Sequence, residues 1–290
     1  MGHRGVQSVS ELLPEVTPYA FVSIDRALAY VKREKGAEEN AEEWVRTFLG
    51  SSTALMESET GRPLAARSYR TQASFTMALA ANSTSATCAD AADLRERDEL
   101  AHDDLPAGVI VESISGTTVT LSKKAIGTDA AASVTVGFGP LVIDGRPDDT
   151  TPEGYQYFYA PETPLQSLHS VSYRDATGAL TEVDITGARI EASSGRVILP
   201  AGYLPEGAQN IEIECVAGYL PPRAGRMGVT TDWHYLEQLQ FRAVKVAWGD
   251  WLNQRGRIGR IQLFTASEFI DDFRLPRDVR DGLAQFRRWP

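Results

Sequence analysis

The residues that could ligate a metal ion form one short run in this 290-residue sequence. His102 is followed by Asp103 and Asp104, and divalent metals accept both imidazole nitrogen and carboxylate oxygen as ligands. A closed site needs several convergent ligands, and the other three histidines stand singly. A solvated, charged loop is therefore the plainer interpretation of this run.

Catalytic motifs are missing from the sequence. There is no G-x-S-x-G elbow, no G-x-x-x-x-G-K-S/T phosphate loop and no H-E-x-x-H metal motif. The dinucleotide pattern G-x-G-x-x-G begins at Gly137-Phe138-Gly139 but has Val142 where its third glycine belongs. The carboxylates around Gly145 lack the order of a calcium loop, and we interpret them as turn residues: Asp144, Asp148 and Asp149. The sequence predicts no enzyme activity, no cofactor and no metal.

Composition is typical of a soluble globular protein, and its charge is unevenly distributed. The apolar fraction of 42% and the charged fraction of 23% are ordinary, and no apolar run reaches the roughly 20 residues of a membrane span. Cys88 and Cys215 lie far apart, and the start lacks a secretion signal, so we expect a cytosolic chain without disulfides. Residues 223–290 carry +4 and the rest carries −14. The acidic part suits a channel through which DNA slides, or simply confers solubility.

Two helices are expected near the N-terminus, after a polar arm. Ser23 can cap a helix that Gly36 stops. The next helix places Trp44 and Phe48 on one apolar face and ends at Gly61, so the pair predicts a helical hairpin.

The middle of the chain reads as strands. The apolar period becomes two from Arg67 onward, and residues 76–138 contain short β-branched runs that predict an inserted β module. A second block, residues 138–218, predicts five further strands in one β unit. Its strands are expected at residues 155–159, 168–173, 182–185, 196–199 and 210–217.

A long helix, residues 232–253, is apolar on nearly all sides. One stripe contains Leu236 and Leu239, and another contains Phe241, Trp248 and Trp251. Such a helix must be buried on more than one face, within the chain or against a neighbouring subunit. Beyond Gly256, apolar anchors alternate with charges, which predicts either a docking tail or a tail that folds back.

Several of these segments together resemble one protein family. They are Thr60-Gly61-Arg62-Pro63-Leu64, Pro164-Leu165-Gln166-Ser167-Leu168-His169-Ser170-Val171, Gly195-Arg196-Val197-Ile198-Leu199-Pro200, and Glu212-Ile213-Glu214-Cys215-Val216-Ala217-Gly218-Tyr219. In this order they resemble the head-to-tail connector (adaptor) proteins of long-tailed bacteriophages and gene transfer agents. The resemblance covers residues 20–75, 140–255 and the C-terminal end, and no single motif in it is diagnostic.

The resemblance implies an architecture of class α+β. A helical hairpin and a long C-terminal helix would pack with an antiparallel β unit, with a small β module inserted and a docking tail extended. The expected parts are a flexible arm at 1–20, a connector core at 21–75 and 139–255, the inserted module at 76–138 and the tail at 256–290.

The resemblance also implies a role in the virion. Twelve copies would form a ring under the portal protein at the neck, between head and tail, after assembly in the host cytoplasm. The ring would line the channel for double-stranded DNA, without sequence recognition, and would bind a downstream neck, stopper or tail-terminator protein. No membrane partner is expected.

Two sets of residues would carry these contacts. The oligomer or core interface would use Trp44, Phe48, Phe241, Trp248 and Trp251. The portal-docking tail would use Ile261, Phe264, Phe269, Phe273, Leu283, Phe286, Arg287 and Arg288.

A carbohydrate-binding module of a tail fibre or host-adhesion device is the alternative. Tyr155, Tyr157 and Tyr159 share one face of an expected strand, and Phe158 lies on the other face. Aromatic platforms bind sugars, although a single aromatic face is more often core or interface.

Overall fold

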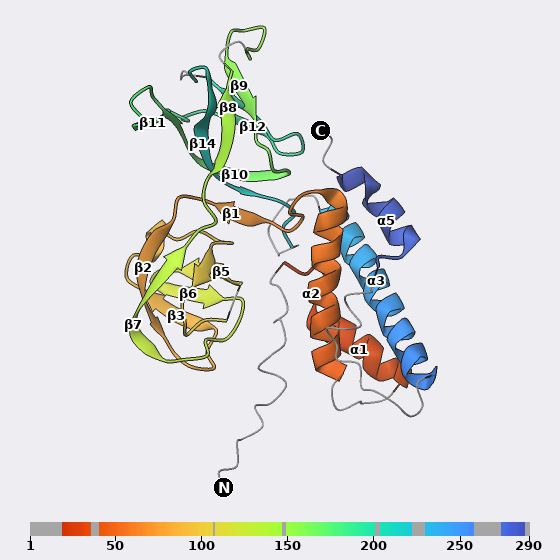
Figure 1. Ribbon diagram of the computed structural model, residues 1–290. Helices are drawn as coiled ribbons and strands as arrows, with labels where there is room; N and C mark the ends of the chain where they lie inside the picture. Colours follow the sequence, from red (N-terminus) through yellow and green to blue (C-terminus); the bar gives the residue numbers. More distant parts are fainter. Residues whose placement is uncertain are drawn as a thin grey trace. The chain divides into compact units, whose positions relative to one another are not determined.

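The chain forms two compact units in a computed structural model (Figure 1). The structure describes residues 19–35, 41–106, 108–146, 149–200, 204–221, 230–257 and 274–287. Residues 1–65 and 220–290 make up the first, which we call the helical unit. Residues 66–219 make up the second, the β unit.

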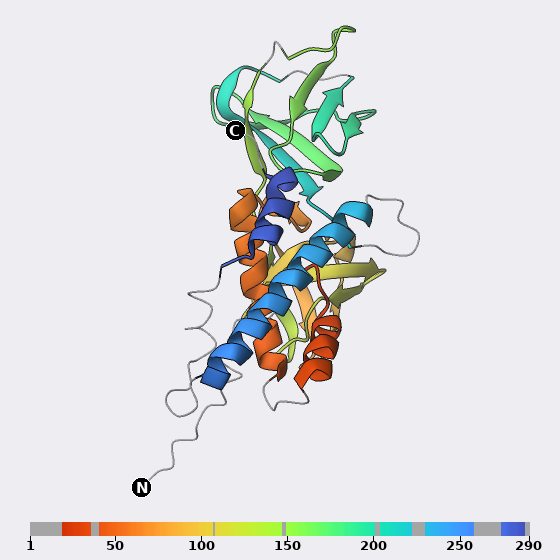
Figure 2. The ribbon, with the colours of Figure 1, turned by 90° about the vertical axis from the view of Figure 1, so that its right-hand side faces the viewer.

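The helical unit contains four α-helices in its described part. They are α1 (Ile24–Lys35), α2 (Ala41–Thr60), α3 (Thr230–Arg257) and α5 (Arg277–Leu283). The Ser23 hydroxyl accepts a hydrogen bond from the Arg26 amide and caps α1, and Gly61 ends α2 with φ at 69°, which glycine adopts readily. Helix α2 packs against α3, and α5 lies along α3 (Figure 2). Their apolar faces bury Phe48, Leu49 and Trp248 between them.

A buried glutamine fixes how these elements meet. Gln240 of α3 is completely buried. Its Oε1 accepts hydrogen bonds from the backbone amides of Phe21 and Val22, both at 2.8 Å. Its Nε2 lies 2.6 Å from Thr53 Oγ1 and 3.2 Å from the Leu49 carbonyl oxygen, both in α2. One side chain therefore joins the segment before α1 to α2 and α3.

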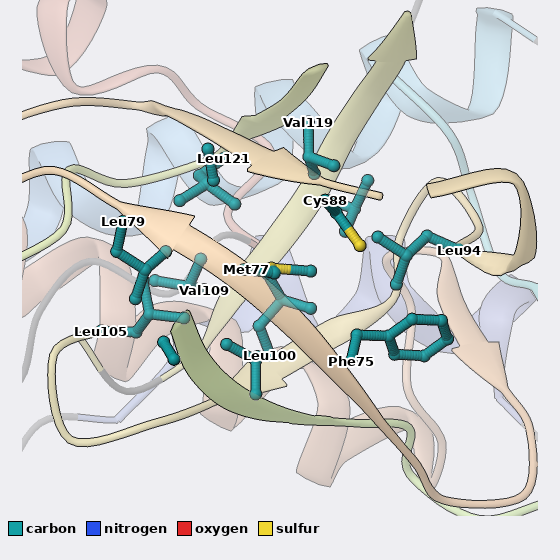
Figure 3. Close-up of a cluster of buried hydrophobic side chains, with 14 of the residues drawn as sticks. Phe75, Met77, Leu79, Cys88, Leu94, Leu100, Leu105, Val109, Val119 and Leu121 are labelled. Atoms are coloured by element: carbon teal, nitrogen blue, oxygen red, sulfur yellow. The ribbon is translucent and has the colours of Figure 1, made fainter. Parts of the chain in front are cut away.

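The β unit contains a closed antiparallel barrel of six strands, in the order β2-β3-β6-β5-β4-β7. These are β2 (Ala73–Leu79), β3 (Ser85–Cys88), β4 (Glu99–Ala101), β5 (Val109–Ser115), β6 (Thr118–Leu121) and β7 (Asp129–Val136). Alternate side chains of each strand point inward and fill the barrel, among them Met77, Leu100 and Val119 (Figure 3). The barrel begins and ends at one place, because Ala73 pairs with Val136.

Two further sheets complete the β unit. Strand β14 (Gly207–Ala217) is central in the larger sheet and pairs with β1 (Arg67–Tyr69), β8 (Leu141–Gly145) and β10 (Leu165–Arg174), which in turn pairs with β11 (Leu180–Glu182). The smaller sheet has the order β12 (Arg189–Glu191), β13 (Arg196–Leu199) and β9 (Gln156–Tyr159). The two sheets share one apolar core, to which Val197 of β13 and Ile213 of β14 both contribute.

The fold class predicted from the sequence is wrong. The described residues are mostly β, with fourteen strands, and residues 73–136 close into a barrel where a small β module was expected. The helices were expected to pack with the antiparallel β unit, but they belong to a compact unit of their own. A period of two shows that a strand has one buried face, but it does not show which strands pair. Closure depends on the pairing of β2 with β7, which lie far apart in the sequence.

Membrane crossing by a helix finds no support. None of the helices in the described part of the chain combines the length and apolar character that a bilayer span requires.

We predict that Gln240→Ala destabilises the helical unit by about 2–4 kcal/mol, because it leaves buried backbone groups without hydrogen-bond partners. Urea unfolding followed by tryptophan fluorescence measures this effect selectively, since all five tryptophans lie in the helical unit. Gln238→Ala, at an exposed position of the same helix, is the matched control and should change stability by less than about 0.5 kcal/mol. Equal effects of the two substitutions would contradict the role given to Gln240.

Candidate functional site

The largest group of buried charges in the described residues lies beside the entry to the barrel. Asp98 is completely buried, and its Oδ2 accepts hydrogen bonds from Arg70 Nη1 at 3.1 Å and from the Arg95 amide at 2.8 Å. Arg70 Nη1 also donates to the Asp93 carbonyl oxygen at 2.7 Å. Arg70 stands between β1 and β2, so this ion pair fixes the point where the chain leaves the larger sheet for the barrel.

A second ion pair joins the same loop to the larger sheet. Arg95 Nη2 donates to Glu214 Oε2 of β14 at 2.7 Å, and the Thr71 amide donates to Glu214 Oε1 at 2.8 Å. Partial burial raises the pKa of Glu214, but the hydrogen bonds from Thr71 and Arg95 outweigh burial and hold the pKa below its usual range. Arg97 Nε adds a bond of 2.9 Å to the Ala66 carbonyl oxygen. We call the five charged residues Arg70, Arg95, Arg97, Asp98 and Glu214 the charged joint.

His169 lies at an irregularity in β10, within electrostatic range of the charged joint. The register of β10 against β14 shifts between Leu168 and Ser170, and such a bulge re-aims the side chain of the extra residue. Partial desolvation lowers the pKa of His169, although the residue is exposed at the strand surface, and the positive charge of Arg95 lowers it further. The neutral form of His169 is therefore favoured in the folded chain.

Ser167 and His169 have the spacing of a nucleophile and its base. Ser167 Oγ lies 3.1 Å from His169 Nε2. A working pair needs a third group that orients the imidazole, and among the described residues no carboxylate is hydrogen-bonded to its other ring nitrogen. The contact between the two residues is exposed on the surface of β10, where water screens it. The pair does not amount to a catalytic site.

His102, Asp104 and Asp129 bring possible metal ligands together. Their ligand atoms lie within 4.8 Å of one another, and all three side chains are half-buried. The imidazole is already engaged, because its Nδ1 lies 3.1 Å from the Asp104 amide, which donates to it. Asp129 Oδ1 likewise accepts from the Ala131 amide at 2.8 Å. The structure thus adds Asp129 to the run that the sequence singled out, and hydrogen bonds within the loops explain its geometry.

The residues predicted for the oligomer or core interface lie in the helical unit. Phe48 and Trp248 are buried in its core. Phe241 is half-buried, and its ring lies between Arg26 at 4.9 Å and Lys245 at 4.4 Å. Trp44 and Trp251 belong to α2 and α3, but their side chains lie outside the described part.

The residues predicted for portal docking divide into two groups. Leu283 and Phe286 are buried in the helical unit, where Phe286 lies 6.0 Å from the ring of Tyr235. Arg287 forms an ion pair with Glu59 of α2. These three side chains therefore make contacts within their own chain. Outside the described residues lie Ile261, Phe264, Phe269, Phe273 and Arg288.

The charged joint escaped the sequence analysis. Glu214 alternates with inward-facing Ile213 and Cys215, and strand alternation by itself would place such a residue on a solvated face. Two arginines and three acids lie between Asp93 and Asp98, and a run of this composition is usually exposed to solvent. A run in which both signs alternate beside an expected strand is the one signal that could have suggested internal ion pairs.

No protein-family model matches the chain, and no curated protein gives a significant match to it.

We predict that the β unit loses stability in two steps as the pH falls. His169 has a lowered pKa in the folded chain, so its contribution is present above about pH 6.5 and is lost as the pH falls from there. Glu214 also has a lowered pKa, so its contribution is present above about pH 4.5 and is lost below that value.

Urea unfolding of the β unit, followed by circular dichroism from pH 8 to pH 3, measures both steps. His169→Gln should remove the pH dependence of the upper range. Glu214→Gln should reduce that of the lower range, to which Glu153, Asp175 and Asp184 also contribute because their pKa values are lowered too. Glu212→Gln, on the same strand as Glu214, controls for the loss of one carboxylate. Unaltered pH profiles in both variants would rule out these contributions.

Proposed function

We propose that this chain is a structural subunit of a viral neck, of the head-to-tail connector type. Copies of it form a ring of twelve beneath the portal protein, and the ring bounds the channel for double-stranded DNA. The far side of the ring binds a neck, stopper or tail-terminator protein. The protein works by binding and by shape, without a catalytic step or a cofactor.

The position of the barrel is the observation that supports this proposal most directly. Its first and last strands pair at Ala73 and Val136, so the chain leaves the larger sheet and returns to it at one place. On either side of this point, β1 pairs with β14, from Arg67 with Ala217 to Tyr69 with Cys215. The segments that resemble connectors lie before residue 75 and after residue 140. They are thus joined in one sheet by strand pairing that does not involve the barrel strands.

The distribution of charge is consistent with a channel role. The β unit holds ten Lys and Arg against twenty-one Asp and Glu, a net charge of −11. The helical unit carries +1, since the whole chain carries −10. A strongly acidic unit repels phosphates, so DNA that passes it is not retained.

The helical unit offers aromatic side chains for contacts between subunits. Tyr235 is exposed and Phe241 is half-buried, and both belong to α3. Aromatic residues are enriched at protein interfaces. A closed ring uses heterologous contacts, so the surface that presents these residues must complement a different face of the next copy.

We expect mass photometry to show a ring when the full chain is mixed with the portal protein of the same virus. The expected ring has about twelve times the 31.7 kDa mass of one chain. It is observed either as a free ring or as this mass added to that of the portal protein. Negative-stain images of the same sample should show a central channel. A chain that stays monomeric both alone and with portal protein would refute the connector proposal.

We further expect that a shortened chain, in which Gln72 is joined through a short glycine linker to Gly137, still forms this ring. The deletion removes the barrel at the point where its ends meet. The deletion also removes Arg95 and leaves the Glu214 carboxylate without its ion-pair partner. A second shortened chain that carries Glu214→Gln controls for this unpaired charge. Loss of the ring from a shortened chain that keeps its helical circular dichroism would assign the subunit contacts to the barrel.

A further inference from the structure

The smaller sheet of the β unit has an aromatic and charged outer face. Tyr159 of β9 pairs with Arg196 of β13, which pairs with Glu191 of β12. In the next row, Tyr157 of β9 and Arg189 of β12 pair with Ile198 of β13 from its two sides. Directly paired residues share one face of a sheet, so these side chains lie on the same side. We call the two tyrosines, the two arginines and Glu191 the tyrosine platform.

The other face of the same sheet is committed to the core. Phe158, Val197 and Leu199 alternate with the platform residues, and all three are buried in the apolar core shared by the two sheets. Ile198 lies within the outer face but is only 8% exposed. The platform is therefore held on a packed sheet, which limits the entropy that its ordering costs on binding.

The two tyrosine rings of the platform contact each other but differ in their exposure to solvent. Their centroids lie 5.8 Å apart with an interplanar angle of 86°, an edge-to-face contact. The guanidinium group of Arg196 lies over the Tyr157 ring, 4.3 Å from its centroid. Tyr157 is thus partly covered, whereas Tyr159 is 53% exposed and keeps ring surface in solvent.

Hydrogen-bonding groups flank the exposed ring. Arg196 Nη1 and Glu191 Oε1 are 3.5 Å apart, at the limit of a hydrogen bond, and the Glu191 side chain is half exposed. Arg196 Nε is buried and makes no hydrogen bond to any described residue, so the donors that a ligand can reach are those of the Nη groups, on a side chain that is 25% exposed. Fixed donors and an acceptor with spare capacity therefore adjoin an aromatic surface.

Charge narrows the class of ligand. The positive charges of Arg189 and Arg196 are offset by Glu191 and by Glu153, which lies within electrostatic range of both arginines. The platform is close to neutral, and it belongs to a unit of net charge −11. Nucleic acids, anionic lipids and acidic glycans are disfavoured by that field.

We propose that the tyrosine platform binds a neutral carbohydrate. The electropositive C–H face of a hexose packs on the negative face of the Tyr159 ring. Its hydroxyl groups accept hydrogen bonds from Arg196 and donate to Glu191, which matches the donor and acceptor placed beside the ring. The inference concerns only the smaller sheet and does not depend on the connector proposal.

Saturation-transfer NMR on the full chain tests the proposal with neutral trisaccharides of glucose, mannose, galactose and N-acetylglucosamine. We expect transfer to at least one neutral sugar and none to a heparin-derived hexasaccharide. Tyr159→Ala should weaken binding by about tenfold or more, since it removes the stacking surface. Ile126→Ala, which removes an exposed apolar side chain from the segment before β7 of the same unit, should leave binding unchanged.

Three results would overturn the proposal. One is the absence of transfer to every neutral sugar in the panel. Another is binding that persists undiminished in Tyr159→Ala while circular dichroism shows the fold intact. The third is a chain dimer that Tyr159→Ala dissociates, because the platform would then be a contact between copies of this chain.

Discussion

The buried carboxylate of Asp98 constrains the β unit more than any other single group. It lies between Arg70, which stands where the chain leaves the larger sheet, and the Arg95 amide in the loop before β4. An uncompensated charge at such depth costs several kcal/mol, so the loop and the strand entry must come together whenever the barrel is closed. Arg95 extends the same constraint to Glu214 of the larger sheet. The barrel is thus held to the larger sheet by an ion pair, and its two ends meet where the chain leaves and re-enters that sheet.

The helical unit uses a neutral group for a comparable purpose. Apolar contacts between α2 and α3 are weakly directional, because residues such as Leu49 and Trp248 can pack at several offsets. Gln240 permits only one of these packing offsets. Its side-chain amide must reach the backbone amides of Phe21 and Val22 and, at the same time, the Leu49 carbonyl oxygen and Thr53 Oγ1 of α2. Buried polar groups of this kind contribute specificity more than net stability.

This division of the molecule has a functional consequence. Charge is concentrated in the β unit, whereas every tryptophan and the aromatic residues of α3 belong to the helical unit. A neutral aromatic platform within an acidic unit is the exception, and this contrast is why we assign it a ligand of its own. Subunit assembly and carbohydrate binding would then use separate surfaces, so that either could change without loss of the other.

The sequence by itself located the local elements. The predicted stops at Gly36 and Gly61 lie one residue beyond α1 and α2, and the predicted strands at 155–159 and 196–199 overlap β9 and β13. Caps, turns and apolar periods are short-range signals, so a single sequence contains them. The sequence also predicted that Tyr157 and Tyr159 share a face opposite Phe158, and the burial of Phe158 agrees with this.

Only the tertiary structure decided the closure of the barrel, the separation of the helices into their own unit and the charged joint. Each depends on partners distant in the sequence, such as Ala73 with Val136 or Arg95 with Glu214. Strand alternation has the same period whichever strand is the neighbour, and a charged side chain has the same identity whether water or a counter-ion surrounds it. The physical reason is that pairing energy depends on long-range geometry, which local pattern does not encode.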